Sequence, residues 1–426
     1  MTERIVVVGG GVAGLICTRV LAAAGRDVRL FEREATVGGR VRTRRVDGFT
    51  IDRGFQVAFE AYPTLGRHLD YRALDMRWFA PAGRVCTGDA PPALVGDALA
   101  DPSLLWPTLT QGGLGWADLW RVWRLRREAM GRSFEGCFAP AVLARSTRDY
   151  LASRGITPRG LARFFAPFYG GILLDRTLET SASVLLYTFK MLAEGRTGVP
   201  REGMGAMTAQ LAAGLPDGTV QCGRAVASVS VVDGRVQGVV LADGSMIEAS
   251  AVVLATEAPV LAALAQGAGV SVPVPTGVRG VTTCYFASRD PVLPGRALWL
   301  NAAEPATVSH AVTVTEVAPE YAPPGVHLLA TNSVGAAAEM PDAALEAAVR
   351  RDVAMMAGRP LPDDLRLVAI ERVPLAQVAQ PPRATQAQVP VRTNVEGLML
   401  ASELWHSSSL EGAARAGEAA AMALLT

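Results

Sequence analysis

The sequence predicts an α/β fold made of two discontinuous units, and three observations predict it. In residues 5–32 a buried strand, a helix and a second strand follow one another in the order that is typical of parallel sheets. In residues 225–248 three short strands are joined by Asp-Gly turns. The chain has 426 residues, which is more than a single hydrophobic core usually holds.

The first unit begins with a strand, a helix and a strand. Ile5–Val8 is a short β-branched run bounded by glycine, which predicts a buried strand. The helix is expected over Val12–Ala24 and ends at Gly25, because glycine accommodates the left-handed conformation that follows a helix. A second strand at Val28–Phe31 then places Glu32 at its carboxyl end.

Three glycines after the first strand indicate a dinucleotide site. In this spacing Gly9 makes a tight turn, Gly11 lets backbone N–H groups reach a pyrophosphate, and Gly14 allows close helix–strand packing. Glu32 can accept hydrogen bonds from a ribose diol. The pattern predicts a Rossmann-like unit whose ligands are Gly9, Gly11, Val12, Ala13, Gly14, Glu32 and Arg33.

A second glycine pair, Gly38-Gly39, lies beside closely spaced arginines. A second glycine turn near the phosphates has no evident role in binding a nicotinamide dinucleotide. It does have one in binding a larger cofactor that lies along the same crevice. In this Gly-Gly-Arg the chain resembles the superfamily of flavin-containing amine oxidases, phytoene desaturases and protoporphyrinogen oxidases, in its desaturase-like branch. The resemblance implies that Gly38, Gly39 and Arg40 line the pyrophosphate and ribityl region of FAD.

The resemblance continues through Gly48–Gln56. The family counterpart of this stretch, Phe-x-x-Asp-x-Gly, approaches the flavin ring and the substrate, which implies the same for Asp52, Gly54 and Phe55. A plain turn residue is an equal interpretation of Asp52.

A three-stranded meander is predicted next, over Ala225–Val232, Arg235–Leu241 and Met246–Glu248. A buried strand at Ala251–Ala255 follows. In the family this meander covers the FAD sheet and a valine of its first strand packs near the adenine, which implies cofactor contacts for Val226 and Ala255. Sheet packing alone also accounts for Val226.

The last segment completes the predicted cofactor unit. After a strand at Val395–Leu400 comes a helix for which Ser408 and Glu411 form a predicted capping box. The resemblance places the backbone N–H groups of Gly412 and Ala413 against the N1–C2=O edge of the flavin. There the positive end of the helix favours reduction by about 1–2 kcal/mol.

One departure from the family stands before this helix. Ser402-Glu403 occupies the place where the family usually has Gly-Asp. Glu403 can still accept a hydrogen bond from a ribityl hydroxyl, although its side chain is longer. The resemblance also assigns Leu410 to the cofactor site.

The second unit is expected to bind the substrate. Residues 76–194 become helical and aromatic, and Phe164–Ile172 resembles the helical substrate domain of desaturase-like members. A mixed sheet with one helix is predicted from Val281–Ala287, Ala297–Leu300, Val308–Thr315, Val326–Asn332, Pro341–Ala357 (the helix) and Leu365–Val373. The predicted domains are therefore 1–75, 195–270 and 385–426 for FAD binding, with 76–194 and 271–384 as a discontinuous α+β substrate domain.

Composition narrows the classes of partner. The net charge of +1 provides no field that would attract nucleic acid. Five dispersed cysteines without Cys-x-x-Cys spacing indicate reduced thiols, a cytoplasmic protein and no structural metal. The sequence contains no run of 18 apolar residues, so we expect no membrane-spanning segment. The oligomeric state stays open.

The resemblance implies an FAD-dependent oxidoreductase in which a hydride passes from a substrate C–H bond to flavin N5, and dioxygen or a quinone reoxidises the flavin. The aromatic helical segment favours a lipophilic substrate of the polyene or isoprenoid type. The alternatives are an amine or porphyrinogen oxidase, or a redox-silent FAD-binding isomerase or assembly protein.

The sequence assigns no catalytic side chain. His406, close to the last helix, is the candidate, and a histidine of a surface loop is an equal interpretation. Lys190 invites comparison with the flavin-proximal lysine of the amine oxidases. It lies on a helix before the Pro-x-x-Gly-Met turn, however, so we expect a solvated side chain.

A tryptophan-rich helix leaves two interpretations. Trp116, Trp120 and Trp123 share one helix face, and arginines surround them. The favoured interpretation packs this face into the protein core. The alternative is peripheral contact with a membrane, with the rings at headgroup level and the arginines on lipid phosphates.

Overall fold

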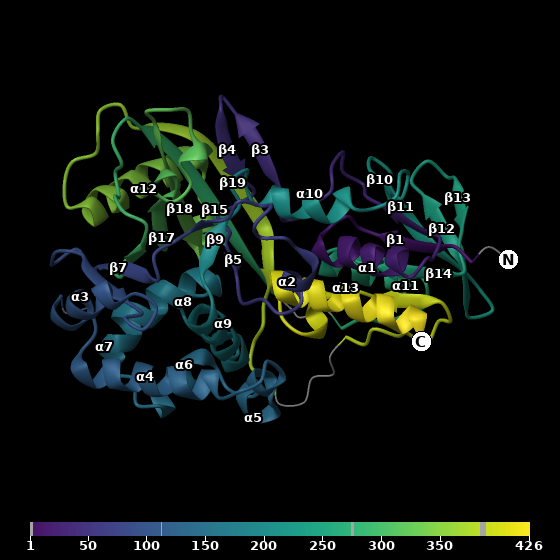
Figure 1. Ribbon diagram of the computed structural model, residues 1–426, viewed down its shortest axis with the longest axis horizontal. Helices are drawn as coiled ribbons and strands as arrows, with labels where there is room; N and C mark the ends of the chain where they lie inside the picture. Colours follow the sequence, from purple (N-terminus) through teal and green to yellow (C-terminus); the bar gives the residue numbers. More distant parts are fainter. Residues whose placement is uncertain (1–2, 112, 274–276, 384–388) are drawn as a thin grey trace.

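The computed structural model describes residues 3–111, 113–273, 277–383 and 389–426. The molecule is elongated, with a parallel sheet at the end that carries the N-terminus and a larger mixed sheet with most helices at the other (Figure 1). The predicted α/β class with an additional mixed sheet is confirmed. The domain limits stay a prediction, and the limit between 384 and 385 lies outside the described residues.

The parallel sheet has five strands in the order β10-β2-β1-β14-β20. Their bounds are Val220–Gln221, Val28–Phe31, Ile5–Val8, Ala251–Leu254 and Leu398–Leu400. β1 and β14 are buried along their whole length, as expected for central strands covered on both faces. The sequence did not predict β10, and the last strand is shorter than expected because only its final three residues pair with β14.

Two helices lie side by side on this sheet (Figure 1). They are α1 (Val12–Ala23) and α13 (Leu410–Leu425), and the predicted glycine C-cap of α1 is confirmed by a φ of +75° at Gly25. A Cβ on Gly417 of α13 would lie 2.2 Å from the carbonyl oxygen of Ala13, so a glycine lets the two helices approach.

The predicted meander is confirmed as β11 (Val226–Val232), β12 (Arg235–Leu241) and β13 (Met246–Glu248). Asp233 and Gly234 both have positive φ, as a two-residue hairpin turn requires. The surrounding short elements are α2 (Leu65–His68), α10 (Gly205–Ala213), α11 (Ala258–Gly267), β3 (Thr43–Val46), β4 (Phe49–Asp52), β5 (Ala58–Phe59), β6 (Arg77–Trp78) and β9 (Thr197–Val199).

The mixed sheet has seven strands in the order β19-β15-β18-β17-β16-β7-β8. Their bounds are Arg366–Val378, Val278–Ser288, His327–Val334, His310–Thr313, Leu298–Asn301, Ala82–Cys86 and Ala93–Gly96. All five predicted strands are present. β7 and β8 were missed, because they come from a segment that looks helical and because β7 pairs with β16, which is remote in sequence.

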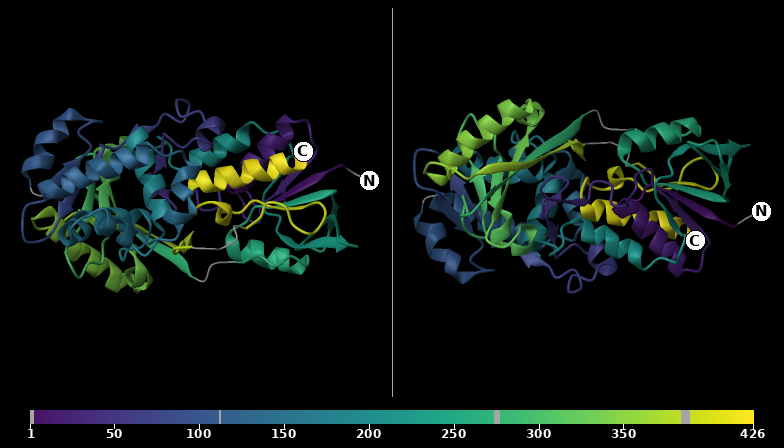
Figure 2. Two further views of the ribbon diagram at one scale, coloured as in Figure 1. Left: turned by 90° about the horizontal axis from the view of Figure 1, so that it is seen from below. Right: turned by 90° about the horizontal axis from the view of Figure 1, so that it is seen from above.

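The two faces of this sheet are buried differently. Cys284 and Phe286 of β15 pack with α12 (Asp342–Ala357), whereas Tyr285 and Ala287 face the main core, as the alternation of a strand requires. In the two views of Figure 2, α12 lies on one side of the sheet and most of the other helices lie on the opposite side.

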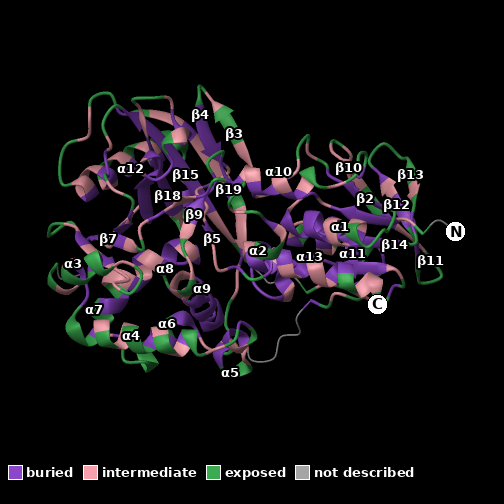
Figure 3. Ribbon diagram, in the orientation of Figure 1, coloured by how far each residue is buried: buried purple, intermediate pink, exposed green. Residues whose placement is uncertain are grey.

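The helical layer comprises α3 (Leu105–Thr110), α4 (Trp116–Met130), α5 (Pro140–Leu143), α6 (Thr147–Ser153), α7 (Pro158–Gly160), α8 (Ala166–Ile172) and α9 (Ala182–Glu194), with a π-helical turn at Leu161–Phe165 and short 3₁₀ turns elsewhere. α4 lies at the outer edge and shows much exposed surface (Figure 3). No helix in the described ranges is long and apolar enough to cross a membrane.

Two expectations about this layer are wrong. Lys190 is buried, not solvated, because other elements enclose α9, and its Nζ lies 2.5 Å from Glu194. The tryptophan face of α4 does not enter the core, because α4 turns Leu125 and Ala129 inward instead. Trp116 and Trp120 are 71% and 57% exposed.

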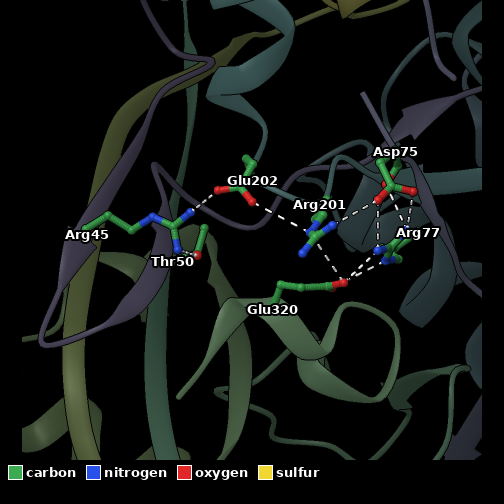
Figure 4. A network of polar contacts seen from close by, with 7 residues as sticks. All are labelled: Arg45, Thr50, Asp75, Arg77, Arg201, Glu202 and Glu320. Carbon is green, nitrogen blue, oxygen red and sulfur yellow. Dashed lines mark hydrogen bonds and ion pairs between the residues drawn. The ribbon is translucent and has the colours of Figure 1, made fainter. Parts of the chain in front are cut away.

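A network of charged residues connects segments that are remote in sequence (Figure 4). The Arg77 guanidinium contacts Glu320 and Asp75, each at 2.6 Å, and Arg201 approaches both of these carboxylates. These residues come from β6, from the turn after β9 and from the chain between β17 and β18. The network therefore ties β6 and the turn after β9 to the connection between β17 and β18, which are interior strands of the mixed sheet.

Candidate functional site

The loop between β1 and α1 and the first turn of α1 each contain a glycine that the protein itself requires. Gly9 has a φ of +108°, and a Cβ there would lie 2.8 Å from the carbonyl oxygen of Ala255. A Cβ on Gly14 would lie 1.9 Å from the carbonyl oxygen of Gly9. The first turn of α1 therefore packs directly on the loop.

Gly11 is different, because no atom of the described residues lies within 4 Å of the place that a Cβ would take. It is the N-cap of α1 and has no side chain to accept from the N–H groups of the first turn, which include those of Val12 and Ala13. Free N–H groups and the helix dipole favour an anion beside this open position. The geometry fits a pyrophosphate.

Glu32 holds the same loop from the end of β2. Its Oε2 accepts a hydrogen bond from the N–H of Gly10 at 2.7 Å, and its Oε1 accepts one from the N–H of Glu34 at 2.9 Å. The carboxylate has further lone pairs with which to accept from a ribose hydroxyl. The next residue, Arg33, is exposed and forms ion pairs with Glu34 and Glu257.

The second glycine loop touches the first. The N–H of Gly38 donates to the carbonyl oxygen of Gly10 at 2.8 Å. A Cβ on Gly39 would lie 3.5 Å from the Cα of Gly11, and both Gly38 and Gly39 have positive φ. The two turns that the sequence placed along one crevice are neighbours in the structure.

Arg40 and Glu403 form an ion pair, with 2.8 Å between Nη2 and Oε2, in which the carboxylate is buried and the guanidinium is partly exposed. Burial alone lowers the pKa of Arg40, but the Glu403 carboxylate outweighs it and the pKa is raised. Ser408 donates its hydroxyl to the same Oε2 at 2.8 Å. Among the described residues Glu403 Oε1 has no partner, which leaves a buried acceptor for a hydroxyl of a ligand.

The predicted capping box of α13 is wrong. The N-cap is Ser409, whose Oγ accepts from the N–H of Gly412 at 3.0 Å. Ser408 lies one residue before the N-cap and bonds to Glu403 instead. Glu411 does not complete a box either. Tertiary partners for both side chains override the local motif.

Glu411 instead caps the short helix α2. Its two oxygens accept from the backbone N–H groups of Thr64 and Leu65 at 2.9–3.0 Å, and the side chain is fully buried. Burial raises the pKa of the carboxyl. The side chain thus fastens α13 to the segment after β5.

The helix N-terminus assigned to the flavin has a specific hydrogen-bond pattern. The N–H groups of Gly412 and Ala413 already donate to Oγ and to the carbonyl oxygen of Ser409. Within the described residues, the N–H groups of Leu410 and Glu411 have no acceptor and are the free donors of this turn.

Two further residues assigned to the cofactor lie at strand ends. The N–H of Ala255, just after β14, donates to the carbonyl oxygen of Val8 at 2.8 Å. Val226 begins β11 and is half-buried opposite Leu241. Both positions border the sheet that carries the glycine loops.

Asp52 ends β4 and is buried. Its carboxylate accepts from the hydroxyls of Thr43 and Tyr321 and from the N–H of Met204, and its carbonyl oxygen accepts from the hydroxyl of Tyr285. Burial raises the pKa of Asp52 to about 6. The carboxylate joins β3, the N-cap of α10 and the 3₁₀ turn that ends at Tyr321, so protein donors occupy much of its acceptor capacity.

Gly54 and Phe55 follow on a turn against the mixed sheet. Gly54 has a φ of +78°, and the N–H of Phe55 donates to Oγ1 of Thr283 at 3.1 Å. The ring of Phe55 lies 6.0 Å from that of Phe79 in an edge-on arrangement and 5.9 Å from that of His310. The turn thus brings an aromatic cluster to the junction of the two units.

Sequence reasoning missed a polar chain beneath Phe55. Thr283 donates its hydroxyl to Oδ1 of Asn332 at 2.5 Å, and Nδ2 of Asn332 lies 2.7 Å from Nε2 of His310. Burial lowers the pKa of His310 to about 4, so the ring is neutral near pH 7. The three residues lie on different strands, β15, β18 and β17, and form no motif in the sequence. They come together only because these strands are neighbours in the sheet.

Comparison with known proteins identifies the family. A model of flavin containing amine oxidoreductases matches residues 12–425. The chain belongs to this family. Family membership implies FAD as the cofactor.

Individual relatives match shorter stretches. Phytoene dehydrogenase of Streptomyces griseus is 29% identical over 288 residues, which are 61% of this chain and 55% of that protein. Hydroxyneurosporene desaturase of Rubrivivax gelatinosus is 51% identical over 53 residues, 12% of this chain and 10% of that one. Coproporphyrinogen III oxidase of Propionibacterium freudenreichii is 32% identical over 121 residues, which are 27% of this chain and 23% of that protein. The matched part spans about half of the first of these relatives and less of the others.

Solved structures agree on the fold. An oxidoreductase from Methanosarcina mazei aligns over 98% of this chain and 99% of its own, with a TM-score of 0.73 and 18% identity. Cyclohexylamine oxidase from Brevibacterium oxydans aligns over 100% of this chain and 99% of its own, with a TM-score of 0.68 and 16% identity. At this identity the likeness concerns the fold alone.

The residues of this family member fit FAD. The open position beside Gly11 suits a pyrophosphate, and the unpartnered Oε1 of Glu403 suits a hydroxyl of the ribityl chain. Glutamate in place of the usual aspartate therefore keeps a free acceptor, which the sequence alone left in doubt.

His406 is not a histidine of an exposed loop. It is 8% exposed and packs 4.9 Å from the ring of Phe134 and 4.0 Å from that of Phe138. Burial lowers its pKa to about 4, and within the described residues its Nδ1 has no partner. It lines a small cavity together with Glu403 and Arg383. The structure thus removes the surface interpretation.

Proposed function

We propose that the protein is an FAD-dependent oxidoreductase that oxidises a lipophilic substrate of the polyene or isoprenoid type, with dioxygen or a quinone as the final electron acceptor. The observation that carries the proposal is the similarity to a phytoene dehydrogenase over 61% of the chain. Shorter matches to carotenoid desaturases point the same way.

When bound, FAD supplies the acceptor for a hydride from a substrate C–H bond. The protein's own part is to bind and orient. The two glycine loops and the N-terminus of α1 would hold the pyrophosphate, and the free first turn of α13 would face the flavin. The residues proposed for direct contact are Gly9, Gly11, Val12, Ala13, Gly14, Glu32, Arg33, Gly38, Gly39, Arg40, Gly54, Phe55, Val226, Ala255, Glu403, Leu410, Gly412 and Ala413.

The surroundings of Phe55 support an apolar substrate. Phe55 and Phe79 pack edge to face, and the neighbouring imidazole of His310 is neutral. The carboxylate of Asp52 is already bonded to Thr43, Met204 and Tyr321. The aromatic rings and the neutral imidazole offer apolar contact, and protein donors already take much of the acceptor capacity of Asp52, which favours the lipophilic substrate over the amine.

An anaerobic reduction assay tests the proposal. FAD-loaded protein is mixed with an acyclic carotenoid precursor, a porphyrinogen or a primary amine, and the absorbance of oxidised flavin is followed. We expect bleaching with the carotenoid precursor. Bleaching with an amine alone would contradict the substrate class. No bleaching by any of the three substrates, in protein whose flavin dithionite still reduces, would contradict the redox role.

Porphyrinogen oxidation is the second candidate. It is favoured by the match to a coproporphyrinogen III oxidase, which is 32% identical over 121 residues. In the same assay this candidate predicts rapid bleaching by coproporphyrinogen and none by the carotenoid precursor.

A further inference from the structure

The outermost face of α4 is aromatic. Trp116, Trp120 and Trp123 are 71%, 57% and 39% exposed, and the rings of Trp120 and Trp123 stack with 4.8 Å between centroids. We call these three residues the tryptophan ridge. A helix on the surface of a globular protein normally turns polar residues to water and apolar ones to the core. Here Leu125 and Ala129 face the core, and large rings take the place of the polar face.

Arginines accompany the ridge. The guanidinium of Arg127 lies over the ring of Trp123, 5.0 Å from its centroid. At about 100° per residue, Arg124 and Arg126 project from opposite flanks of the same helix. Within the described residues, neither Arg124 nor Arg127 has an acidic partner. Their charges are free to meet an external anion.

The segment that contains α4 is much more basic than the rest of the chain. Residues 116–163 contain ten arginines and four acidic residues, a net charge of +6, whereas the complete chain has a net charge of +1. The basic character is therefore local and surrounds the ridge. Such a field attracts a negatively charged surface at short range without making the protein basic as a whole.

A groove lies beside the ridge, between α4 and the end of α6. Its volume is about 430 Å³, and it is lined by Arg121, Arg124, Leu125, Glu128, Ser153 and Arg154. The Glu128 carboxylate is occupied by Arg154 at 2.8 Å, by Arg132 at 2.9 Å and by the hydroxyl of Tyr150. The lining therefore keeps an excess of positive charge next to exposed rings.

We propose that α4 docks this protein on the surface of an anionic phospholipid bilayer. The tryptophan ridge lies at the level of the headgroups, where rings bury apolar area and keep their indole N–H groups hydrated. Arg124 and Arg127 meet lipid phosphates beside it, while the arginine stems cover the flanks of the rings. The combination of rings and unpaired arginines on one helix selects a lipid surface, because a free phosphate would leave the ridge in water.

Vesicle co-sedimentation of the full-length protein tests the proposal. We expect binding to vesicles of phosphatidylcholine with phosphatidylserine that is about tenfold or more stronger than binding to phosphatidylcholine alone, and that weakens as salt is added. The double variants Trp116→Ser/Trp120→Ser and Arg124→Glu/Arg127→Glu should each lose most of the binding. Because all four side chains are exposed or unpaired, both variants should keep the circular dichroism spectrum and melting temperature of the parent.

Matched controls distinguish binding through the tryptophan ridge from non-specific adsorption to vesicles. Val232→Ser/Met246→Ser removes exposed apolar side chains from the meander at the other end of the molecule. Arg26→Glu/Arg351→Glu reverses two exposed arginines elsewhere that, within the described residues, also have no acidic partner. Both controls should bind vesicles like the parent. Should the tryptophan variant unfold, the arginine variant and quenching of the parent's tryptophan fluorescence by brominated lipid decide the matter.

Three results would overturn the proposal. The first is no binding of the parent to anionic vesicles at low salt. The second is binding that the arginine reversal leaves intact. The third is a dimer in sedimentation velocity that disappears in the tryptophan variant, which would assign the ridge to a second copy of the chain.

Discussion

Two glycines at the start of α1, Gly11 and Gly14, have different physical reasons to be glycine. Gly14 has no room for a side chain, since a Cβ would lie 1.9 Å from a carbonyl oxygen of the loop. Gly11 has room, since no described residue lies within 4 Å, and its φ of −78° is one that any residue adopts. Packing explains the glycine at position 14, and we propose that a ligand explains the glycine at position 11.

Substitution at these two positions separates cofactor binding from folding. Gly11→Val should fold with nearly unchanged stability and lose FAD, because its side chain fills the place proposed for the pyrophosphate. Gly14→Val should lose FAD and also about 3 kcal/mol or more of stability, because the loop must move. Flavin absorbance after purification and urea unfolding measure the two effects. A yellow Gly11→Val protein would refute the assignment of the loop.

At the scale of elements, α13 is held by its tertiary partners more than by its own cap. Glu411 reaches the start of α2, and Gly417 meets α1. The local sequence around Ser408 suggested a self-contained helix start. In the structure α13 instead joins two other helices, α2 through Glu411 in its first turn and α1 through Gly417.

Removing the Glu411 side chain should lower the free energy of unfolding more than removing a partly exposed charged side chain of the same helix. Glu411→Ala leaves two buried N–H groups of α2 without an acceptor, so we expect a loss of about 2–4 kcal/mol and faster hydrogen exchange at Thr64 and Leu65. Glu418→Ala is the matched control, because that residue forms partly exposed pairs with Arg67 and His68, and it should cost under about 1 kcal/mol. Equal losses in the two variants would contradict the role of Glu411.

At the scale of the whole molecule, Asp52 connects four segments that are remote from one another in sequence. Its hydrogen bonds reach Thr43 and Met204 on one side, and Tyr285 and Tyr321 on the other. Burial raises its pKa from 3.8 to about 6, so the folded protein holds this proton more tightly than the unfolded chain. The contribution of Asp52 to stability is therefore fully present below about pH 4 and is lost as the pH rises through about 6.

Asp52→Asn should remove this pH dependence. The difference in unfolding free energy between parent and variant should fall by up to about 3 kcal/mol as the pH rises from 4 to above 6, and stay constant beyond that. Urea unfolding at a series of pH values measures it. Because His310 and His406 have lowered pKa values and act in the opposite direction, only the difference between the two proteins isolates Asp52. A constant difference across this range would show that burial of Asp52 does not govern its proton.

The sequence by itself determined the parallel sheet around the first glycine loop, the meander and five strands of the mixed sheet. These elements carry local signals, namely β-branched runs, Asp-Gly turns and glycines whose spacing has a direct geometric cause. The family also followed from motifs of this kind, because a phosphate-binding turn is built from residues that are close together in the chain.

Only the tertiary structure decided the pairing of Arg40 with Glu403, the capping of α2 by Glu411 and the polar chain that ends at His310. It also turned the tryptophan ridge outward and buried Lys190, both against expectation. The physical reason is common to all of these. Each depends on which distant segment covers a side chain, and a helical period fixes which residues share a face but leaves open whether that face meets the core or the solvent.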